Sequence, residues 1–370
     1  MMESSYDTND SHYQSISYLG HCCNGIAVIH LSRHIPSNTL VAIKKFNMDK
    51  AKEDTVLIEH EIVLTRQFHH PNILPYLAAY VNGPEVCVIS PLMAFGSCKN
   101  LIENHFTEGL PELAIAFIIR DVIQGLDYIH KKGYIHRAIR ASHILVSSTG
   151  QACLTGFRYA CQIVENGKWQ KRIHSFPNST ANNLNWLSPE VLEQNLQGYN
   201  EKSDIYSIGI TCCELGNGIV PFADMPTTLM LTEKVRGHPP PLYDSSTFQG
   251  LGNLELSQSP RNGEMGDSNG ASSSNLQSKA RIYSSRQFTD AFHSFTEICL
   301  EKNPTRRPSA TELLHQSFFK LCKRGESVPD LLHPVMPIND QISSETDDWE
   351  AVLAAEKMQE MDINTCEWDF

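Results

Sequence analysis

One stretch of ten residues, 136–145, constrains the fold of this chain more than any other. It reads His-Arg-Ala-Ile-Arg-Ala-Ser-His-Ile-Leu and follows residues 112–131, whose apolar side chains recur at helical spacing. An apolar run, residues 144–154, comes next and is interrupted by a turn at Ser148-Thr149-Gly150. The sequence therefore predicts a long helix, a loop and a β-hairpin in that order, which indicates a mixed helix and sheet protein.

The loop resembles the catalytic loop of protein kinases, whose pattern is H-R-D-x-x-x-x-N. His136 and Arg137 match this pattern. Ala138 stands where a kinase has its catalytic-base aspartate, and His143 stands where a kinase has a metal-binding asparagine. Because a methyl group can neither accept a proton nor orient a substrate hydroxyl, the loop predicts a kinase-like fold without kinase chemistry.

A glycine-rich loop is expected near the N-terminus. Gly20 and Gly25 occupy the first and last glycine positions of a G-x-G-x-x-G motif. Cys22 stands where the motif has its middle glycine. Glycines there let the backbone close over phosphates, and a side chain obstructs that approach. Taken alone, the pattern is as consistent with an ordinary hairpin turn.

A lysine–glutamate pair is predicted next. Residues 41–44 read Val-Ala-Ile-Lys, and order and spacing favour a pair between Lys44 and Glu61, with Glu59 as the rival partner. Ser90 ends an apolar strand and reads as a small gatekeeper that leaves an adenine pocket open. The predicted nucleotide-contacting residues are Gly20, Gly25, Ala42, Lys44, Glu61 and Ser90.

Gly156-Phe157-Arg158 stands where a kinase has D-F-G. The missing aspartate is the carboxylate that holds magnesium against the phosphates, and Arg158 adds charge of the wrong sign for a cation site. The four departures, at positions 22, 138, 143 and 156, lie within a context that otherwise matches, which argues against misalignment. They predict phosphate transfer far below that of a working kinase, and no metal site.

The scaffold motifs of the second lobe are retained. Glu190 belongs to a Ser-Pro-Glu that resembles A-P-E, Asp204 opens a predicted large buried helix, and Arg307 belongs to Asn-Pro-Thr-Arg-Arg-Pro. These matches predict a buried ion pair between Glu190 and Arg307. The expected fold class is α+β, a bilobal protein-kinase-like fold with a small β-rich N-lobe and a large helical C-lobe.

Composition separates the predicted domain from its flanks. The Ser-, Gly- and Asn-rich segment 244–285 is predicted to be a disordered insertion, and residues 1–14 a disordered tail. The predicted units are a tail over 1–14, a kinase-like domain over 15–323 (N-lobe about 15–90, C-lobe about 91–323) and an acidic tail over 324–370.

Charge and cysteine usage indicate which partners and which cellular compartment to expect. The net charge is −12, and residues 340–370 hold ten Asp and Glu against one Lys, which argues against nucleic acid or an anionic membrane surface. No secretory segment or membrane-spanning apolar run is found. The eleven Cys are scattered and form no C-x-x-C, which favours reduced cytosolic thiols over disulfides or zinc.

Taken together, the motifs resemble those of the sterile-twenty-related adaptor (STRAD) pseudokinases. The most particular matches are residues 136–145, 187–190, 194–199, 202–207 and 209–211. The family ends in W-E-F, and this chain ends in Trp368-Asp369-Phe370, where Asp keeps the charge and shortens the reach. Lys44 also differs from one well-known member, which has Arg there.

This resemblance implies an adaptor rather than a phosphotransferase. It implies binding of liver kinase B, a serine/threonine kinase, and of the helical-repeat scaffold Mo-twenty-five through Trp368, Asp369 and Phe370. It also implies a cytoplasmic and nuclear location. The residues themselves predict ATP binding through Lys44, Glu61 and Ser90, with little need for magnesium because two metal ligands are missing. Two alternatives stay open, a residual low-activity kinase and a plain nucleotide-binding module. A phosphotransfer assay distinguishes the residual kinase from the adaptor. Pull-down of a kinase partner distinguishes the adaptor from the nucleotide-binding module.

Overall fold

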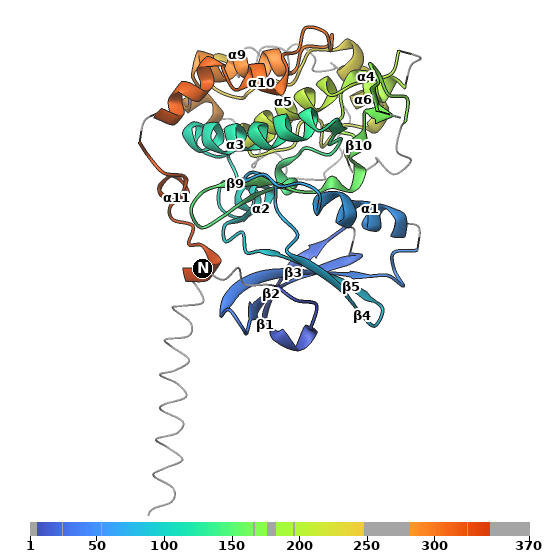
Figure 1. Cartoon of the computed structure of the whole chain (residues 1–370). Helices are drawn as coiled ribbons and strands as arrows, with labels where there is room; N and C mark the ends of the chain where they lie inside the picture. Colours follow the sequence, from blue (N-terminus) through green and yellow to red (C-terminus); the bar gives the residue numbers. More distant parts are fainter. Residues whose placement is uncertain are drawn as a thin grey trace, which may run out of the picture.

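The computed structural model describes residues 6–23, 25–52, 54–165, 167–175, 183–194, 197–247, 282–323 and 325–340. These residues form two lobes, a β-rich N-lobe and a larger helical C-lobe (Figure 1). The predicted α+β, bilobal architecture is confirmed.

The N-lobe is an antiparallel sheet in the strand order β1-β2-β3-β5-β4, with helix α1 beside it (Figure 1). Side chains alternate along β3, so Val41 and Ile43 are buried in one apolar cluster while Phe46 is buried in another. The register places Ala42 opposite Ser90. The elements are η1 Asp10–His12, β1 Tyr13–Cys22, β2 Ala27–His34, β3 Thr39–Asn47, α1 Thr55–Thr65, β4 Ala78–Asn82 and β5 Glu85–Pro91.

The C-lobe is built around two long helices, α3 and α5. The apolar stripe that predicted a helix over 112–131 is fully buried in α3 and consists of Ile118, Val122, Leu126 and Ile129. Helix α5 is buried along nearly its whole length. The helices are α2 Cys98–Asn104, α3 Glu112–Lys131, α4 Pro189–Glu193, α5 Lys202–Asn217, α6 Thr227–Arg236, α9 Asp290–Cys299, α10 Ala310–Leu313 and α11 Val328–Leu331.

Short strands and turns of 3-10 helix make up the segments that connect the helices of the C-lobe. Strands β6, β8 and β9 form a three-stranded sheet, while β7 pairs with β10 and β11 pairs with β12. The elements are β6 Gly96–Ser97, β7 Tyr134–Ile135, η2 Ala141–His143, β8 Ile144–Val146, β9 Ala152–Leu154, η3 Phe157–Tyr159, β10 Cys161–Gln162, β11 Val164–Glu165, β12 Lys168–Trp169 and η5 Ser317–Lys323.

The lobes are joined where α3 passes the segment that precedes β4. A Cβ on Gly125 would lie only 2.7 Å from Asn72 O, so the close approach requires glycine. The Asn72 side chain donates to Ala152 O at 3.0 Å, and its carbonyl accepts from Leu154 N at 2.9 Å. A loop of the N-lobe is thereby fixed to the β8–β9 hairpin that follows the catalytic-loop stretch.

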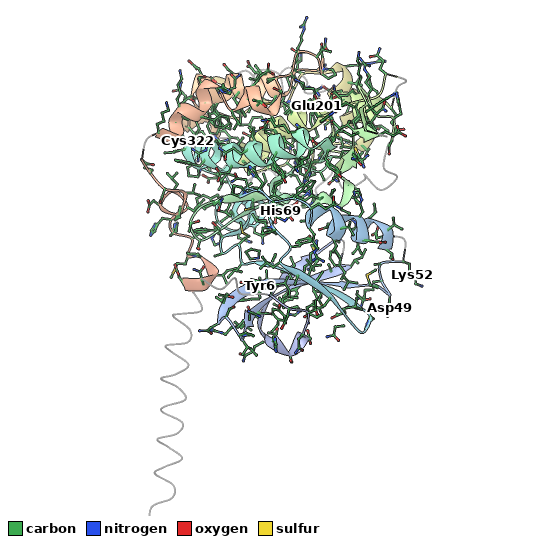
Figure 2. The ribbon with its side chains drawn as sticks, viewed as in Figure 1. Tyr6, Asp49, Lys52, His69, Glu201 and Cys322 are labelled. Carbon is green, nitrogen blue, oxygen red and sulfur yellow. The ribbon has the colours of Figure 1, made fainter. Side chains whose placement is uncertain are left out.

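The N-terminal segment departs from the prediction of disorder over residues 1–14. Residues 6–14 are described, and they form η1 and the start of β1. The Tyr80 hydroxyl donates to Asp10 Oδ1 at 2.6 Å, and the ring centroid of Tyr6 lies 4.9 Å from that of His34; Figure 2 shows Tyr6 against the N-lobe. The polar composition of this segment did not predict its ordered structure, because its stabilising contacts are made with residues far away in the sequence. Residues 1–5 lie outside the described part.

The edges of the predicted insertion, 244–285, belong to the C-lobe. Asp244 is fully buried, accepts from Phe288 N at 3.1 Å and lies 2.7 Å from His293 Nε2. On the other side, the Tyr283 hydroxyl donates to Asn217 O at 2.9 Å. The prediction was therefore too wide at both ends, and residues 248–281 lie outside the described part.

The chain after residue 323 is also more integrated than predicted. Val328 and Leu332 are buried in the C-lobe core, and Ile338 N donates to Ala94 O in the hinge at 3.0 Å. Figure 1 shows this segment running from the C-lobe along the hinge side of the molecule. Before this segment, the C-lobe ends in α10 and η5. The motif Trp368-Asp369-Phe370 lies outside the described residues.

Candidate nucleotide site and altered catalytic loop

Lys44 on β3 and Glu61 on α1 form an ion pair between the sheet and the helix. Lys44 Nζ lies 2.9 Å from Glu61 Oε1, and the Tyr76 hydroxyl donates to the same oxygen at 2.6 Å. Burial would raise the pKa of Glu61, but Lys44 and the Tyr76 hydrogen bond lower it. Burial also disfavours the Lys44 ammonium, yet Glu61 raises its pKa above the ordinary value. The pair is therefore charged at neutral pH, and Glu59, the rival partner, is exposed instead.

Helix α1 is attached to the segment that follows β9 at two points. Arg158 is buried, and its Nη2 lies 2.9 Å from Asp54 Oδ2, immediately before α1. In the middle of the helix, His60 Nε2 donates to Ala160 O at 2.9 Å. These contacts hold α1 inward, in the position that brings Glu61 to Lys44. Sequence reasoning missed both of them, because they join segments that no local pattern relates.

The turn between β1 and β2 stands in place of the predicted glycine-rich loop. Gly20 and Gly25 have φ values of 151° and 80°, which are strained for other residues. Between them, Cys22 and Cys23 are half-buried and pack against an apolar cluster that includes Phe46. The Phe46 ring centroid also lies 4.5 Å from Lys44 Nζ. Cys23, which the motif comparison did not single out, therefore shares the half-buried position of Cys22.

The small residues predicted to line an adenine pocket lie together. Ser90 is buried, and its Oγ lies 3.5 Å from Ala42 O across the β3–β5 ladder. Beyond Pro91 the chain turns into the C-lobe, where Gly96 N donates to Met93 O at 2.8 Å. The gatekeeper position therefore carries a hydroxymethyl group rather than a bulky side chain.

The catalytic-loop stretch is closely held but has no carboxylate at position 138. Ala138 is buried, and its N donates to His136 Nδ1 at 3.2 Å. His136 Nε2 in turn donates to Thr155 O at 3.0 Å. Burial lowers the pKa of His136 to about 4, so the imidazole is neutral and serves as a structural link.

His143 lies directly against Gly156. Its Nδ1 donates to Ala138 O at 2.6 Å, and Arg140 Nη2 lies 3.3 Å from its Nε2. Burial and the charge of Arg140 lower the pKa of His143, so it is neutral. A Cβ at Gly156 would lie 2.7 Å from the imidazole, and the φ of 85° also disfavours a side chain. His143 and any side chain at position 156 therefore compete for the same space.

Asp204 holds the catalytic-loop stretch from the start of α5. Its carboxylate accepts from the backbone N of His136 and of Arg137, each at 2.8 Å, and lies 2.9 Å from His130 Nε2. Burial would raise the pKa of Asp204, but the contact with His130 lowers it. Arg137 sits at a φ of 63°, a conformation that these backbone hydrogen bonds support.

The predicted pair of Glu190 and Arg307 is present and buried. Arg307 Nη1 donates to Glu190 Oε1 at 2.6 Å, and Nη2 donates to Oε2 at 2.8 Å. Arg307 also donates to the backbone carbonyls of Glu301, Lys202 and Lys302. One guanidinium thereby joins α4, the start of α5 and the loop before α10.

The assembled site retains the frame of a kinase and lacks its carboxylates at positions 138 and 156. Among the described residues, no three His, Cys, Asp or Glu side chains gather in a way that could hold a metal ion. Within the same part of the chain, no helix combines the length and apolarity needed to cross a membrane.

Comparison with known proteins agrees with this geometry. The protein kinase domain model matches residues 13–319. STE20-related kinase adapter protein alpha of Mus musculus is 41% identical over 379 residues, which cover 100% of this chain and 87% of the relative. The Homo sapiens alpha protein is 41% identical (97% and 84% covered), and the Homo sapiens beta protein is 40% identical (88% and 80% covered). The chain therefore belongs to the STE20-related kinase adapter proteins, within the protein kinase domain family.

Proposed function

We propose that this chain is a catalytically silent adaptor that binds liver kinase B and stabilises the active conformation of that partner. One observation carries the proposal. The frame of a kinase domain is kept, with α1 held by the Lys44–Glu61 and Arg158–Asp54 pairs, while positions 138 and 156 carry no carboxylate. Such a molecule offers a partner protein the surface of a kinase domain but has no catalytic base at position 138. The relatives' names, kinase adapter proteins, support a kinase as partner.

The adaptor acts in this proposal by shifting a conformational equilibrium of its partner. It binds the active conformer more tightly than the inactive one, and about 10⁴-fold discrimination would move a 1:99 equilibrium to 99:1. The Mo-twenty-five scaffold binds the end of the chain through Trp368, Asp369 and Phe370. The complex retains liver kinase B in the cytoplasm, and the adaptor itself occupies both cytoplasm and nucleus.

ATP is the proposed ligand of the site, bound without magnesium. Lys44 would face the phosphates, the turn from Gly20 to Gly25 would cover them, and Ala42 and Ser90 would line the adenine side. Magnesium has no carboxylate at position 156 to hold it, and Arg158 disfavours a cation nearby. Bound nucleotide supplies rigidity between the lobes in this proposal and undergoes no reaction.

The adaptor proposal predicts a protein that is silent alone and activating in a complex. The purified chain should transfer no phosphate to itself or to a generic peptide, whereas adding it with the scaffold should raise peptide phosphorylation by liver kinase B. Ala138→Asp should stay silent, because positions 143 and 156 still lack metal ligands. Radiolabelled ATP gives the measurement. Turnover by the chain alone that disappears in Lys44→Met would contradict the proposal and favour a residual kinase.

The ligand proposal predicts that ATP raises the melting temperature equally with EDTA and with magnesium. Ligand at a hundred times its Kd stabilises a folded protein by about 2.7 kcal/mol. Lys44→Met should remove the shift. Lys45→Met is the matched control, since alternation along β3 points Lys45 to the opposite face. A shift that needs magnesium, or no shift at all, would contradict ATP binding of this kind.

A further inference from the structure

A strap formed by residues 327–340 joins the core of the C-lobe to the hinge, residues 91–96. Figure 1 shows it leaving α11 and passing along the hinge side of the molecule. Its first anchor is α11, which packs against α3. Val328 and Leu332 at this anchor are buried among the apolar side chains of the C-lobe core. The strap therefore begins at a fixed point of the larger lobe.

The second anchor is the turn of the β8–β9 hairpin. A Cβ on Gly150 would lie 2.6 Å from Pro329 Cδ and 2.7 Å from Val328 Cβ. These separations are too short for carbon atoms that are not bonded, so only glycine lets the strap approach this turn. Val146 in the same hairpin accepts from Phe95 N in the hinge at 3.0 Å. One hairpin therefore contacts both the strap and the hinge.

The third anchor is a backbone hydrogen bond to the hinge itself. Ile338 N donates to Ala94 O at 3.0 Å, and Ala94 is buried. Only residues 333–337 separate this bond from the anchor in the C-lobe core, and two of them, Pro334 and Pro337, are proline. Because proline fixes φ, this connection is short and stiff. A movement of the hinge away from the C-lobe therefore has to break the hydrogen bond.

We propose that the strap restrains the hinge from outside and thereby keeps the wall of the nucleotide site in place. Ser90, which would line the adenine side of the proposed ATP site, stands directly before the hinge, so a movement of the hinge displaces it. Ile338 is a positioning residue in this scheme, since it acts through the backbone of Ala94. The effect on ATP affinity rests on the proposed ATP binding, whereas the restraint on the hinge does not.

The first experiment compares two substitutions at position 338 in the full-length protein. Ile338→Pro removes the N–H that donates to Ala94 O, whereas Ile338→Ala keeps the N–H and removes most of the side chain. Amide exchange of the hinge peptide, residues 92–97, should become about fivefold faster in Ile338→Pro and stay unchanged in Ile338→Ala. Hydrogen exchange read by mass spectrometry gives the rates, and the peptide that covers α9 is the internal reference.

Three outcomes of this comparison would overturn the strap. Equal exchange of the hinge peptide in wild type and Ile338→Pro would mean that the hydrogen bond does not restrain the hinge. Equal acceleration of the hinge peptide in Ile338→Ala would assign the effect to the side chain. Equal acceleration of the hinge peptide and the α9 peptide would indicate a general loss of stability instead.

A second pair of variants tests the anchor at the β8–β9 turn. Gly150→Ala places a methyl group against Pro329 and should accelerate exchange of the hinge peptide. Gly83→Ala, in the turn between β4 and β5, is the matched control. Gly83 also has a positive φ (56°, against 83° for Gly150), but among the described residues no atom lies within 4 Å of its added Cβ. Equal hinge exchange in the two glycine variants would contradict this anchor.

ATP affinity distinguishes the strap from the proposed ligand. Titration followed by the rise in melting temperature should give a Kd about fivefold weaker for Ile338→Pro than for wild type and Ile338→Ala. If the wild type bound no ATP, the proposed ligand would be wrong, and the exchange rates of the hinge would still decide the strap. If Ile338→Pro had a faster hinge and an unchanged Kd, the positioning role of Ile338 would be overturned.

Discussion

Replacing Arg307 by methionine should lower the free energy of unfolding by about 3–5 kcal/mol. The substitution leaves the Glu190 carboxylate buried without its partner and removes donors from three backbone carbonyls. Glu190→Gln should cost less, because the amide oxygen can still accept from the guanidinium. Urea unfolding of the full chain, followed by tryptophan fluorescence and circular dichroism, gives the comparison.

The matched control is the surface pair of Lys99 and Glu103 on α2. Its atoms lie 3.4 Å apart, and about half of each side chain is exposed (50% and 57%). Lys99→Met should therefore change stability by no more than about 0.5 kcal/mol. If Arg307→Met behaved like Lys99→Met, the buried pair would have no stabilising role and the charges would have to be neutralised in another way.

Truncating Trp368 or Phe370 to alanine should weaken binding to Mo-twenty-five by about 2–4 kcal/mol each at most, and by less than the sum together. A large aromatic side chain buries about 150–250 Å² when it enters a pocket. The many acidic residues before the motif should speed association with a basic surface, so the on-rate should fall as salt is added. Titration of the full-length chain against purified scaffold measures both effects.

Ile363→Ala is the matched control for the tail, because it removes an apolar side chain outside the motif. It should bind as wild type does. Activation of liver kinase B should decrease in the aromatic variants in parallel with scaffold affinity. Equal affinity of wild type and the double variant would leave the motif without a role. A drop in the variant's own melting temperature would instead mean that the tail packs on its own domain.

Periodicity and motif spacing were enough to predict the frame of this protein. The helix expected over 112–131 is observed as Glu112–Lys131, because its apolar stripe faces the core at regular spacing. The pair Glu190–Arg307 could be predicted because both residues lie in recognisable motifs, and the pair Lys44–Glu61 because Glu61 follows the Lys44 motif in the expected order and spacing. Local pattern thus identified the elements and those contacts between elements that a motif already contains.

The remaining contacts depend on packing that no local pattern records. The Tyr76 hydroxyl donates to Glu61, and Asp54 forms an ion pair with Arg158. Neither Tyr76 nor Asp54 belongs to a recognisable motif. The segment after residue 323 is predicted from composition to belong to an acidic tail, but Val328 lies in the C-lobe core and the backbone of Ile338 binds the hinge. Composition averaged over a segment cannot report one buried side chain or one backbone hydrogen bond.

The contact between His143 and Gly156 ties the side chains at these two positions to each other. A single mutation to aspartate at position 156 meets the imidazole ring, which a Cβ would approach to 2.7 Å. A single mutation to asparagine at position 143 replaces the imidazole that donates to Ala138 O and restores no carboxylate. Each single substitution therefore disturbs a close contact of the loop and leaves the other kinase positions unfilled. On the proposed function, a working phosphotransfer site would therefore need coordinated changes at positions 138, 143 and 156 rather than a single substitution.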